Sequence, residues 1–446
     1  MNYIKKIFKT NIFKFSTVLA FNHGLNFLLI FIYLKTISSA TYGTIGLIQS
    51  YAILIGVISM LGIRDGFYTI YYKVNKNTLY SNFYLFFIFM ASLLFFISIY
   101  FKEFLTHYLS IPLEFYNLIF IYAMSNALYA NFEIVMRLEN WNNLYLSISL
   151  FRGITVFLFK LYFVFHIENS IDFITNILLI DIFSFLIISM IIFVMVNIKI
   201  LKFKFQLDFS LYPRLFKVGL PFLASNGSGW IFNGFDRVLI ERFFSLEILG
   251  IYLYGTRIAA ALGNIIHQVL NLLYAPKSLQ LLSTGETLAM ENLGKRVVNW
   301  LIGFIFISIL LTFFVYFSLK YFNILNYDMI SILFLGGFLV EIAKIVPRIN
   351  GQKILFLEKS YILSSLYIVS SLVIVVLYYL FLPIMGLGII FLAQIFIYFS
   401  ISYYIHLYLV KKTDFNFIQI SSLFWVFSFL LSFILFIYFF NIRMSL

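Results

Sequence analysis

The sequence predicts an all-α protein that crosses a membrane many times. Of its 446 residues, 63% are hydrophobic and 11% are charged, and the mean hydropathy is +0.99. A soluble domain carries about 25% charged residues, so this composition excludes one with a solvated surface. Apolar stretches of about 20 residues, long enough to cross the hydrocarbon core as helices, recur about thirteen times along the chain.

The predicted helices form two sets of six, followed by one more helix. The most basic loop of the chain, NIKILKFKFQLDFSLYPRL, separates the two sets. The first set covers residues 15–33, 44–61, 82–101, 115–136, 144–165 and 173–196. The second set covers residues 215–240, 249–275, 298–319, 329–346, 361–382 and 386–410, and the last helix covers 418–440.

This division predicts the domain organisation. We expect an N-terminal six-helix lobe at 1–200, a basic cytoplasmic linker at 201–214, a second six-helix lobe at 215–410 and an additional C-terminal helix at 411–446. Two six-helix halves are a recurring transporter plan, with the substrate bound in a central cavity between them.

The two sets also begin alike. With small gaps, FKFSTVLAFNHGLNFLLIFIYLKTISSATYGTIGLIQS overlays FKVGLPFLASNGSGWIFNGFDRVLIERFFSLEILGIYLYGT. The overlay brings Asn22 near Asn226 and Gly43 near Gly250. This weak internal likeness supports two related halves.

Charge patterning predicts the orientation. Most of the 31 Lys and Arg residues lie in the N-terminal tail and in every second loop. By the positive-inside rule the N-terminus is cytoplasmic and, with an odd number of helices, the C-terminus is external. This distribution also explains the net charge of +13 without a nucleic acid as partner.

Several classes of chemistry lack the residues they need. The chain has no Cys, which excludes disulfides and thiolate metal sites. It has no GxxxxGK phosphate-binding loop, so we expect no hydrolysis of ATP. The five His residues are scattered without metal-ligand spacing, and we expect neither metal nor cofactor.

The most informative residue is Arg257, near the centre of an apolar helix. An arginine at this depth costs about 2.5–3.5 kcal/mol, so its presence calls for a role. Gly255, Ala259 and Gly263 form a stripe of small residues on nearly the opposite face, suited to close packing on another helix. Arg257 then either faces a cavity and binds an anion or forms a structural ion pair.

Other charged residues also lie within predicted helices. Arg152 and Asp181 fall at similar depths on adjacent antiparallel helices, where they either pair or serve transport. Lys160 lies closer to the external face and either snorkels to it or joins the anion path. Glu341 and Lys344 have i,i+3 spacing near a helix end, which favours an interfacial pair.

Polar residues in two further helices remain open to alternative interpretations. Asn22 and His23 give the first helix a polar stripe that either lines the cavity and carries protons or makes interhelical hydrogen bonds. Pro221 lies among glycines in the helix at 215–240, which favours a hinge or close packing. The adjacent Asp236 and Arg237 point about 100° apart and therefore serve different partners.

One segment resembles a known family. GLPFLASNGSGWIFNGFDRVLIERFFSLEILGIYLYGTRIAAAL is similar to the seventh and eighth helices of the polysaccharide, or O-antigen, flippases. The similar parts are Gly219 to Pro221, the pair Asp236 and Arg237, and the turn Leu249 to Tyr252. These flippases belong to the multidrug, oligosaccharidyl-lipid and polysaccharide (MOP) exporter superfamily, in which twelve or fourteen helices are usual.

The resemblance implies a flippase of the bacterial inner membrane. It would move an undecaprenyl-diphosphate-linked oligosaccharide, an O-antigen or capsule repeat unit, to the external leaflet by alternating access. Membrane lipids, a proton or sodium ion and the glycan polymerase machinery are the implied partners. The candidate substrate-binding residues are Arg257, Arg152, Lys160, His23, Asn22 and Asn226, and the candidate coupling or gating residues are Asp181, Asp236, Arg237 and Pro221.

Two alternatives come from other functional classes. A multidrug and cation antiporter of the same superfamily would need acidic residues for cationic drugs, and the near-central cations here at least match the acids. A glycan polymerase or glycosyltransferase would resemble a pattern with a large or acidic external loop. The first predicted external loop, TISSATYG, is short and neutral, so we expect no enzymatic activity.

The positive-inside pattern makes a direct prediction. Reporter fusions after Lys204 and Lys412 should read as cytoplasmic, and a fusion after Arg443 should read as external. A cytoplasmic reading after Arg443 would show that the last predicted helix does not cross the membrane.

Overall fold

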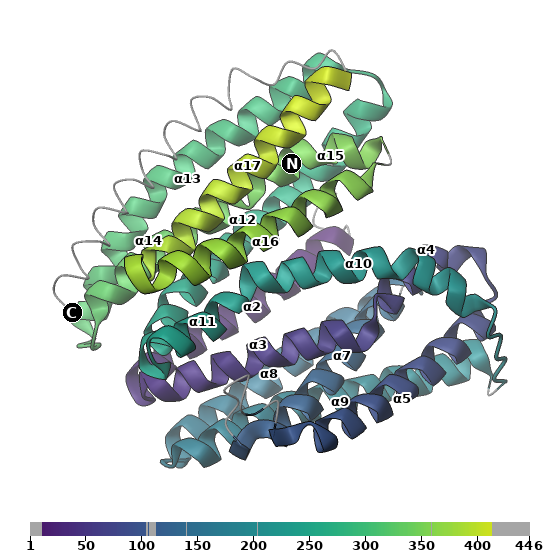
Figure 1. Ribbon diagram of the computed structural model, residues 1–446, viewed down its shortest axis with the longest axis horizontal. Helices are drawn as coiled ribbons and strands as arrows, with labels where there is room; N and C mark the ends of the chain where they lie inside the picture. The colour runs from purple at the N-terminus through teal and green to yellow at the C-terminus, as the bar shows by residue number, and fades with distance from the viewer. Residues whose placement is uncertain are drawn as a thin grey trace. The chain divides into compact units, whose positions relative to one another are not determined.

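The computed structural model describes residues 11–103, 106, 113–139, 141–202, 204–357 and 359–412. Within these residues every regular element is a helix, which confirms the all-α prediction (Figure 1). The last predicted helix, 418–440, lies outside the described residues.

The first six predicted helices are confirmed. Their chain order also includes short elements that the hydropathy pattern did not predict: the helix α4, two single 3₁₀ turns, η1 and η2, and a turn of π-helix, η3. The elements are α2 (Asn11–Thr36), α3 (Ser39–Met60), α4 (Ile63–Ile70), η1 (Tyr71–Lys73), α5 (Lys76–Tyr100), η2 (Leu113–Phe115), α7 (Tyr116–Leu138), α8 (Asn142–His166), α9 (Ser170–Val196) and η3 (Asn197–Leu201).

The next six predicted helices are also present, with two differences. The helix predicted at 215–240 is broken at Gly234, and the helix predicted at 329–346 continues after a break at Lys344. The elements are α10 (Leu211–Asn233), α11 (Phe235–Phe243), α12 (Leu246–Ser283), α13 (Thr287–Tyr321), α14 (Tyr327–Ala343), α15 (Ile345–Phe356), α16 (Ser360–Met385) and α17 (Gly388–Lys412).

The helices have the dimensions of membrane spans. Ten of them, counted over the described residues alone, are long and apolar enough to cross a bilayer. Large apolar side chains such as Phe95, Phe151 and Phe314 are exposed on the surface, where lipid rather than water can cover them. The chain is therefore a multi-pass membrane protein, while its orientation stays a prediction.

Contacts in space between residues divide the chain into two compact units. The first unit is Met1–Leu29 with Thr44–Trp230, and the second is Ile30–Gly43 with Ile231–Leu446. Helix α2 thus contributes to both units. In the first unit α7 packs against α9 and α8, and in the second α12 packs along α14 with α13, α15 and α17 around them (Figure 1). The lobe limits expected from the sequence stay a prediction.

Two glycines aligned by the internal likeness meet in the second unit. A Cβ atom on Gly43 would lie 2.1 Å from the backbone oxygen of Leu246, and one on Gly250 would lie 1.8 Å from the backbone oxygen of Ser39. The first turns of α3 and α12 therefore pack backbone against backbone. Only glycine permits this approach, because any Cβ would overlap a main-chain atom.

The predicted small stripe of α12 packs against α14. A Cβ on Gly255 would lie 2.6 Å from Cβ of Leu333, and one on Gly263 would lie 2.5 Å from Cβ of Glu341. This close packing confirms the small-residue face of α12 and leaves the opposite face free for other contacts.

The glycines of α10 do not share one role. In the first unit Gly219 packs against Gly62, whose φ is +74°, and a Cβ on Gly219 would lie 2.4 Å from the Gly62 oxygen. By contrast, a Cβ on Gly227 or Gly229 would have no described atom within 4 Å. Close packing therefore accounts for Gly219 only, and the hinge predicted around Pro221 remains a prediction.

The glycine contact generates a stability prediction. Gly250→Ala should destabilise the protein by about 3 kcal/mol, the upper end of the usual cost of overpacking, because the new methyl meets a backbone oxygen that cannot rotate away. The melting temperature of the detergent-purified protein measures the effect. Gly227→Ala is the matched control and should change little; equal melting temperatures for the two variants would contradict the close approach.

Candidate functional site

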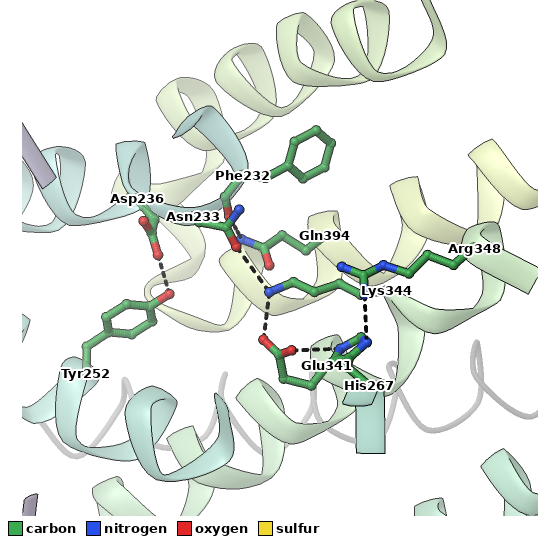
Figure 2. Close-up of polar contacts among 9 residues, drawn as sticks. All are labelled: Phe232, Asn233, Asp236, Tyr252, His267, Glu341, Lys344, Arg348 and Gln394. Carbon is green, nitrogen blue, oxygen red and sulfur yellow. Dashed lines mark hydrogen bonds and ion pairs between the residues drawn. The ribbon is translucent and has the colours of Figure 1, made fainter. Parts of the chain in front are cut away.

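The polar interior of the second unit includes a break between two helices. Helix α10 ends at Asn233 and α11 begins at Phe235, with Gly234 between them. The carbonyl of Phe232 accepts a hydrogen bond of 2.9 Å from Nε2 of Gln394 on α17 (Figure 2). A side chain from a distant helix thus satisfies a carbonyl at the break, as a buried backbone requires.

The first turn of α11 carries a buried carboxylate. Asp236 is only 4% exposed, and its Oδ2 accepts a 2.5 Å hydrogen bond from the hydroxyl of Tyr252 (Figure 2). Its other oxygen, Oδ1, is buried and has no hydrogen-bond partner among the described residues. Such a group is costly in a protein interior, which marks Asp236 as a candidate functional residue.

A second carboxylate lies at the centre of a charged network. Oε1 of Glu341 accepts a 2.6 Å hydrogen bond from Nζ of Lys344, and Oε2 lies 3.1 Å from Nε2 of His267 on α12. Nη1 of Arg348 lies 3.2 Å from Nδ1 of the same His267. The predicted Glu341–Lys344 pair is present, and its buried carboxylate is also tied to α12 through His267 (Figure 2). Its place near the membrane interface stays a prediction.

Gly263 makes room for this network. Its missing side chain lets Cβ of Glu341 approach α12, so that the carboxylate reaches His267 one turn further along. Sequence reasoning missed His267. The signal that could have found it was its i,i+4 position from Gly263, on the same face as the small stripe.

Arg257 lies on the other side of α12, as predicted. Its Nη1 donates a 3.0 Å hydrogen bond to the hydroxyl of Tyr42, and its guanidinium lies 4.9 Å from the centre of that ring. Tyr42 in turn stacks on Tyr254, with 4.1 Å between the ring centres. These aromatic contacts hold the guanidinium in place.

Residues from the helix break, Glu341, Lys344 and Arg257 line one cavity of about 110 Å³ within the second unit. Its walls carry three cationic side chains and two acidic ones, so the lining is net positive when all are ionised. The charged lining residues are Arg237, Arg257, Lys344, Asp236 and Glu341, and the others are Phe232, Asn233, Tyr252, Thr256, Ala260, Gly337, Val340, Phe391 and Gln394.

The chemistry of this lining suits an anion. Guanidinium and ammonium groups form their strongest hydrogen bonds with phosphate or carboxylate oxygens, and burial strengthens such contacts. Among the residues that the structure describes, no three His, Asp or Glu side chains are grouped to hold a metal ion.

In the first unit, the charged side chains pair differently from the sequence prediction. Asp181 pairs with Lys160, whose Nζ lies 2.8 Å from Oδ2, and not with Arg152. Arg152 instead donates from Nε to Oγ of Ser184 at 3.1 Å, and its guanidinium lies 4.4 Å from the ring centre of Phe185. Lys160 is eight residues further along α8, so it reaches Asp181 while Arg152 stacks on an aromatic face.

The predicted snorkelling of Lys160 is therefore replaced by an ion pair. The Lys160 side chain is 12% exposed and that of Asp181 6%. A pair this buried needs both members, because removing one leaves an uncompensated charge.

The remaining sequence-predicted residues belong to the first unit and are not among the residues that line the cavity. Nδ2 of Asn22 donates to Oγ of Ser149 at 3.0 Å, and Nδ2 of Asn226 donates to Oδ2 of Asp65 at 2.9 Å. Both asparagines thus make interhelical hydrogen bonds, which for Asn22 is the structural alternative that the sequence left open. His23 is half-buried on α2, and Pro221 lies inside α10.

Comparison with known proteins identifies the fold. The sequence matches no protein-family profile and no curated protein. A solved multidrug resistance MATE family transporter of the MOP superfamily, in an inward-facing conformation, matches with a TM-score of 0.64 at 14% identity, covering 91% of this chain and 100% of that one. The chain has the fold of the MOP transporters.

Two further structures agree with this fold. The lipid II flippase MurJ, in an inward closed conformation, matches with a TM-score of 0.63 at 16% identity, covering 97% of this chain and 98% of that one. A variant of the Vibrio cholerae MATE transporter VcmN matches with a TM-score of 0.56 at 14% identity, covering 92% and 98%. The fold is therefore shared by drug transporters and a lipid flippase.

The observed ion pair in the first unit makes a prediction. Lys160→Gln and Asp181→Asn should each destabilise the protein by about 3–5 kcal/mol, because each leaves a buried charge alone. The double variant should lose much less than the sum when unfolding is followed by thermal stability in detergent.

A matched cycle tests the geometry. Arg152→Gln combined with Asp181→Asn should give additive losses, since these two side chains do not pair. Coupling in that cycle and additivity in the Lys160 cycle would contradict the observed pairing.

Proposed function

We propose that the chain is a flippase that moves an undecaprenyl-diphosphate-linked oligosaccharide from the cytoplasmic to the external leaflet of the bacterial inner membrane. The observation that carries this proposal is the cavity lined by Arg237, Arg257 and Lys344. The substrate would be an O-antigen or capsule repeat unit, moved by alternating access, with the N-terminus in the cytoplasm.

The diphosphate is the part of the substrate that needs such a cavity. It carries two negative charges, and a charge alone in a low-dielectric interior is very costly. Two guanidinium groups and an ammonium replace the lost water with charge-assisted hydrogen bonds. A volume of about 110 Å³ holds several water molecules, which suits a phosphate-sized group and not a glycan.

The fold supports transport of either kind of substrate. MurJ is described as a lipid II flippase and the other neighbours as MATE transporters. The favoured alternative is therefore a multidrug and cation antiporter. Asp236 and Glu341 in the same cavity favour it, yet Glu341 is already neutralised by Lys344, which leaves the lining net positive.

In the first unit, one cationic side chain is part of the proposed anion path. Lys160 and Asp181 offset each other's charge, so Arg152 is the cation there that we propose for the anion path. Asp236 and Arg237, close to the helix break, are proposed to respond to the substrate during gating, with Pro221 bending α10. Contact with the polymerase machinery is part of the same proposal.

Substitution of Arg257 tests the proposal. In a strain that lacks its own flippase, Arg257→Ala should lower surface glycan by at least about tenfold, because a hydrogen bond to a charged group is worth about 1.5–3 kcal/mol. Arg257→Lys should retain part of it, because the charge survives while the bidentate fork is lost. Immunoblotting of the surface glycan, normalised to membrane abundance, gives the measurement.

The control is Arg296→Ala, which removes an exposed cation of α13 and should leave glycan display unchanged. Full glycan display by Arg257→Ala at normal abundance would contradict the proposed anion site. Loss of resistance to cationic drugs, with glycan unaffected, would favour the antiporter.

A further inference from the structure

Lys344 is shared between two acceptors at the cavity wall. Its Nζ lies 2.6 Å from Oε1 of Glu341 and 3.1 Å from Oδ1 of Asn233 (Figure 2). The ammonium is a compact charge on a flexible four-carbon stem, and both Lys344 and Asn233 line the cavity. An anion that enters the cavity therefore competes with Glu341 for the same ammonium.

The two carboxylate oxygens of Glu341 have different partners, so the loss of Lys344 affects only one of them. Oε1 is held by Lys344, while Oε2 faces His267 at 3.1 Å. If Lys344 turns toward an anion, Oε1 becomes a buried carboxylate oxygen without a counter-ion. Such a charge is neutralised at far lower cost by binding a proton than by remaining ionised.

His267 cannot take that proton easily, because its tautomer is fixed. Nη1 of Arg348 is always a donor, so Nδ1 of His267, 3.2 Å away, must be the acceptor. The hydrogen of a neutral imidazole then sits on Nε2 and is donated to Oε2 of Glu341. Both ring nitrogens are occupied, and the open position for a proton is Oε1.

Among the charged groups around the cavity, Glu341 is the acid that Lys344 contacts. Other titratable or charged groups near Glu341 come from four elements: Asp236 and Arg237 of α11, Tyr252 and Arg257 of α12, Arg348 of α15 and Tyr398 of α17. Asp236 accepts its hydrogen bond from Tyr252, whereas Lys344 donates to Glu341 and Asn233 (Figure 2). The ammonium therefore acts on Glu341, and Asp236 belongs to a separate contact.

We infer that Glu341 is the proton-binding group of this transporter and that Lys344 couples it to the substrate. When the anion takes Lys344, a proton from the bulk solution, passed through cavity water, binds Oε1 of Glu341; when the anion leaves, Lys344 returns and the proton goes back to the solution. The inference rests on the proposed function, because it needs an anion in the cavity. It selects the proton over the sodium ion and names the residues that bind it.

The proton would offset one of the two charges of a diphosphate diester. The loaded state then carries one net negative charge more than the empty state. A membrane potential that is negative inside still favours its outward movement, at about 2.3 kcal/mol for each elementary charge and 100 mV.

The test is a count of protons bound together with a probe. Dihexyl diphosphate, a diester that stays ionised near neutral pH, is titrated into the full-length protein in lipid nanodiscs by calorimetry. Two buffers with different ionisation enthalpies give the number of protons taken up for each probe bound. The wild-type protein should take up a measurable fraction of a proton, at most about one.

Two substitutions should remove proton uptake while shifting affinity in opposite directions. Glu341→Gln mimics the protonated acid and frees Lys344, so the probe should bind at least about fivefold more tightly. Lys344→Gln removes the shared cation, so the probe should bind at least about fivefold more weakly. The exposed acid of α12 supplies the matched control, Glu247→Gln, which should change neither quantity.

The outcomes separate this inference from the proposed function. Probe binding with the same proton number in the wild type and in Glu341→Gln would overturn the inference and leave anion binding intact. Absence of probe binding to the wild-type protein would overturn the proposed function, and the inference would fall with it.

Discussion

The ion pair between Glu341 and Lys344 is the interaction on which the interior of the second unit depends. It connects α14 to the break after α10 through Asn233, and to α12 and α15 through His267 and Arg348. Without Lys344, the buried carboxylate of Glu341 would lose its counter-ion, at a cost of several kcal/mol. The pair therefore links four helices at the wall of the cavity.

Small residues let α12 and α14 approach closely enough to form these contacts. Gly263 admits Glu341, Gly255 admits Leu333, and Gly337 lies with its missing Cβ 3.0 Å from Cβ of Ala259. These contacts bring α12 and α14 close enough for short charged contacts, while Arg257 stays on the opposite side of α12. One helix thus supplies both a tightly packed face and a polar face.

The sequence was sufficient for most of the fold because membrane helices are set by local hydropathy. Twelve of the predicted helices have counterparts in the described residues, and the small stripe of α12 lies where its spacing placed it. The break at Gly234 was not predicted, since it depends on distant helices: Gln394 satisfies the Phe232 carbonyl, and Lys344 binds the side chain of Asn233.

The charged contacts were harder to predict for the same reason. Depth along a helix suggested that Asp181 faces Arg152, but aromatic stacking holds Arg152 elsewhere and Lys160 has the reach to replace it. Likewise, the spacing of Glu341 and Lys344 described the pair correctly and gave no sign of His267 on another helix. Sequence periodicity gives the face of a side chain and not the partner across from it.

The division of α2 and α3 between the units has a consequence for biosynthesis. Tyr42, which stacks on Tyr254 and binds Arg257, precedes that arginine by 215 residues. At about 5–20 residues per second, the ribosome needs roughly 10 to 40 s to make the intervening chain. For that interval residues 30–43 lack the rest of the second unit, and Tyr42 has neither Tyr254 nor Arg257 to bind. The segment must stay in the bilayer or with the insertion machinery, in a form that can still bind α12 once α12 is made.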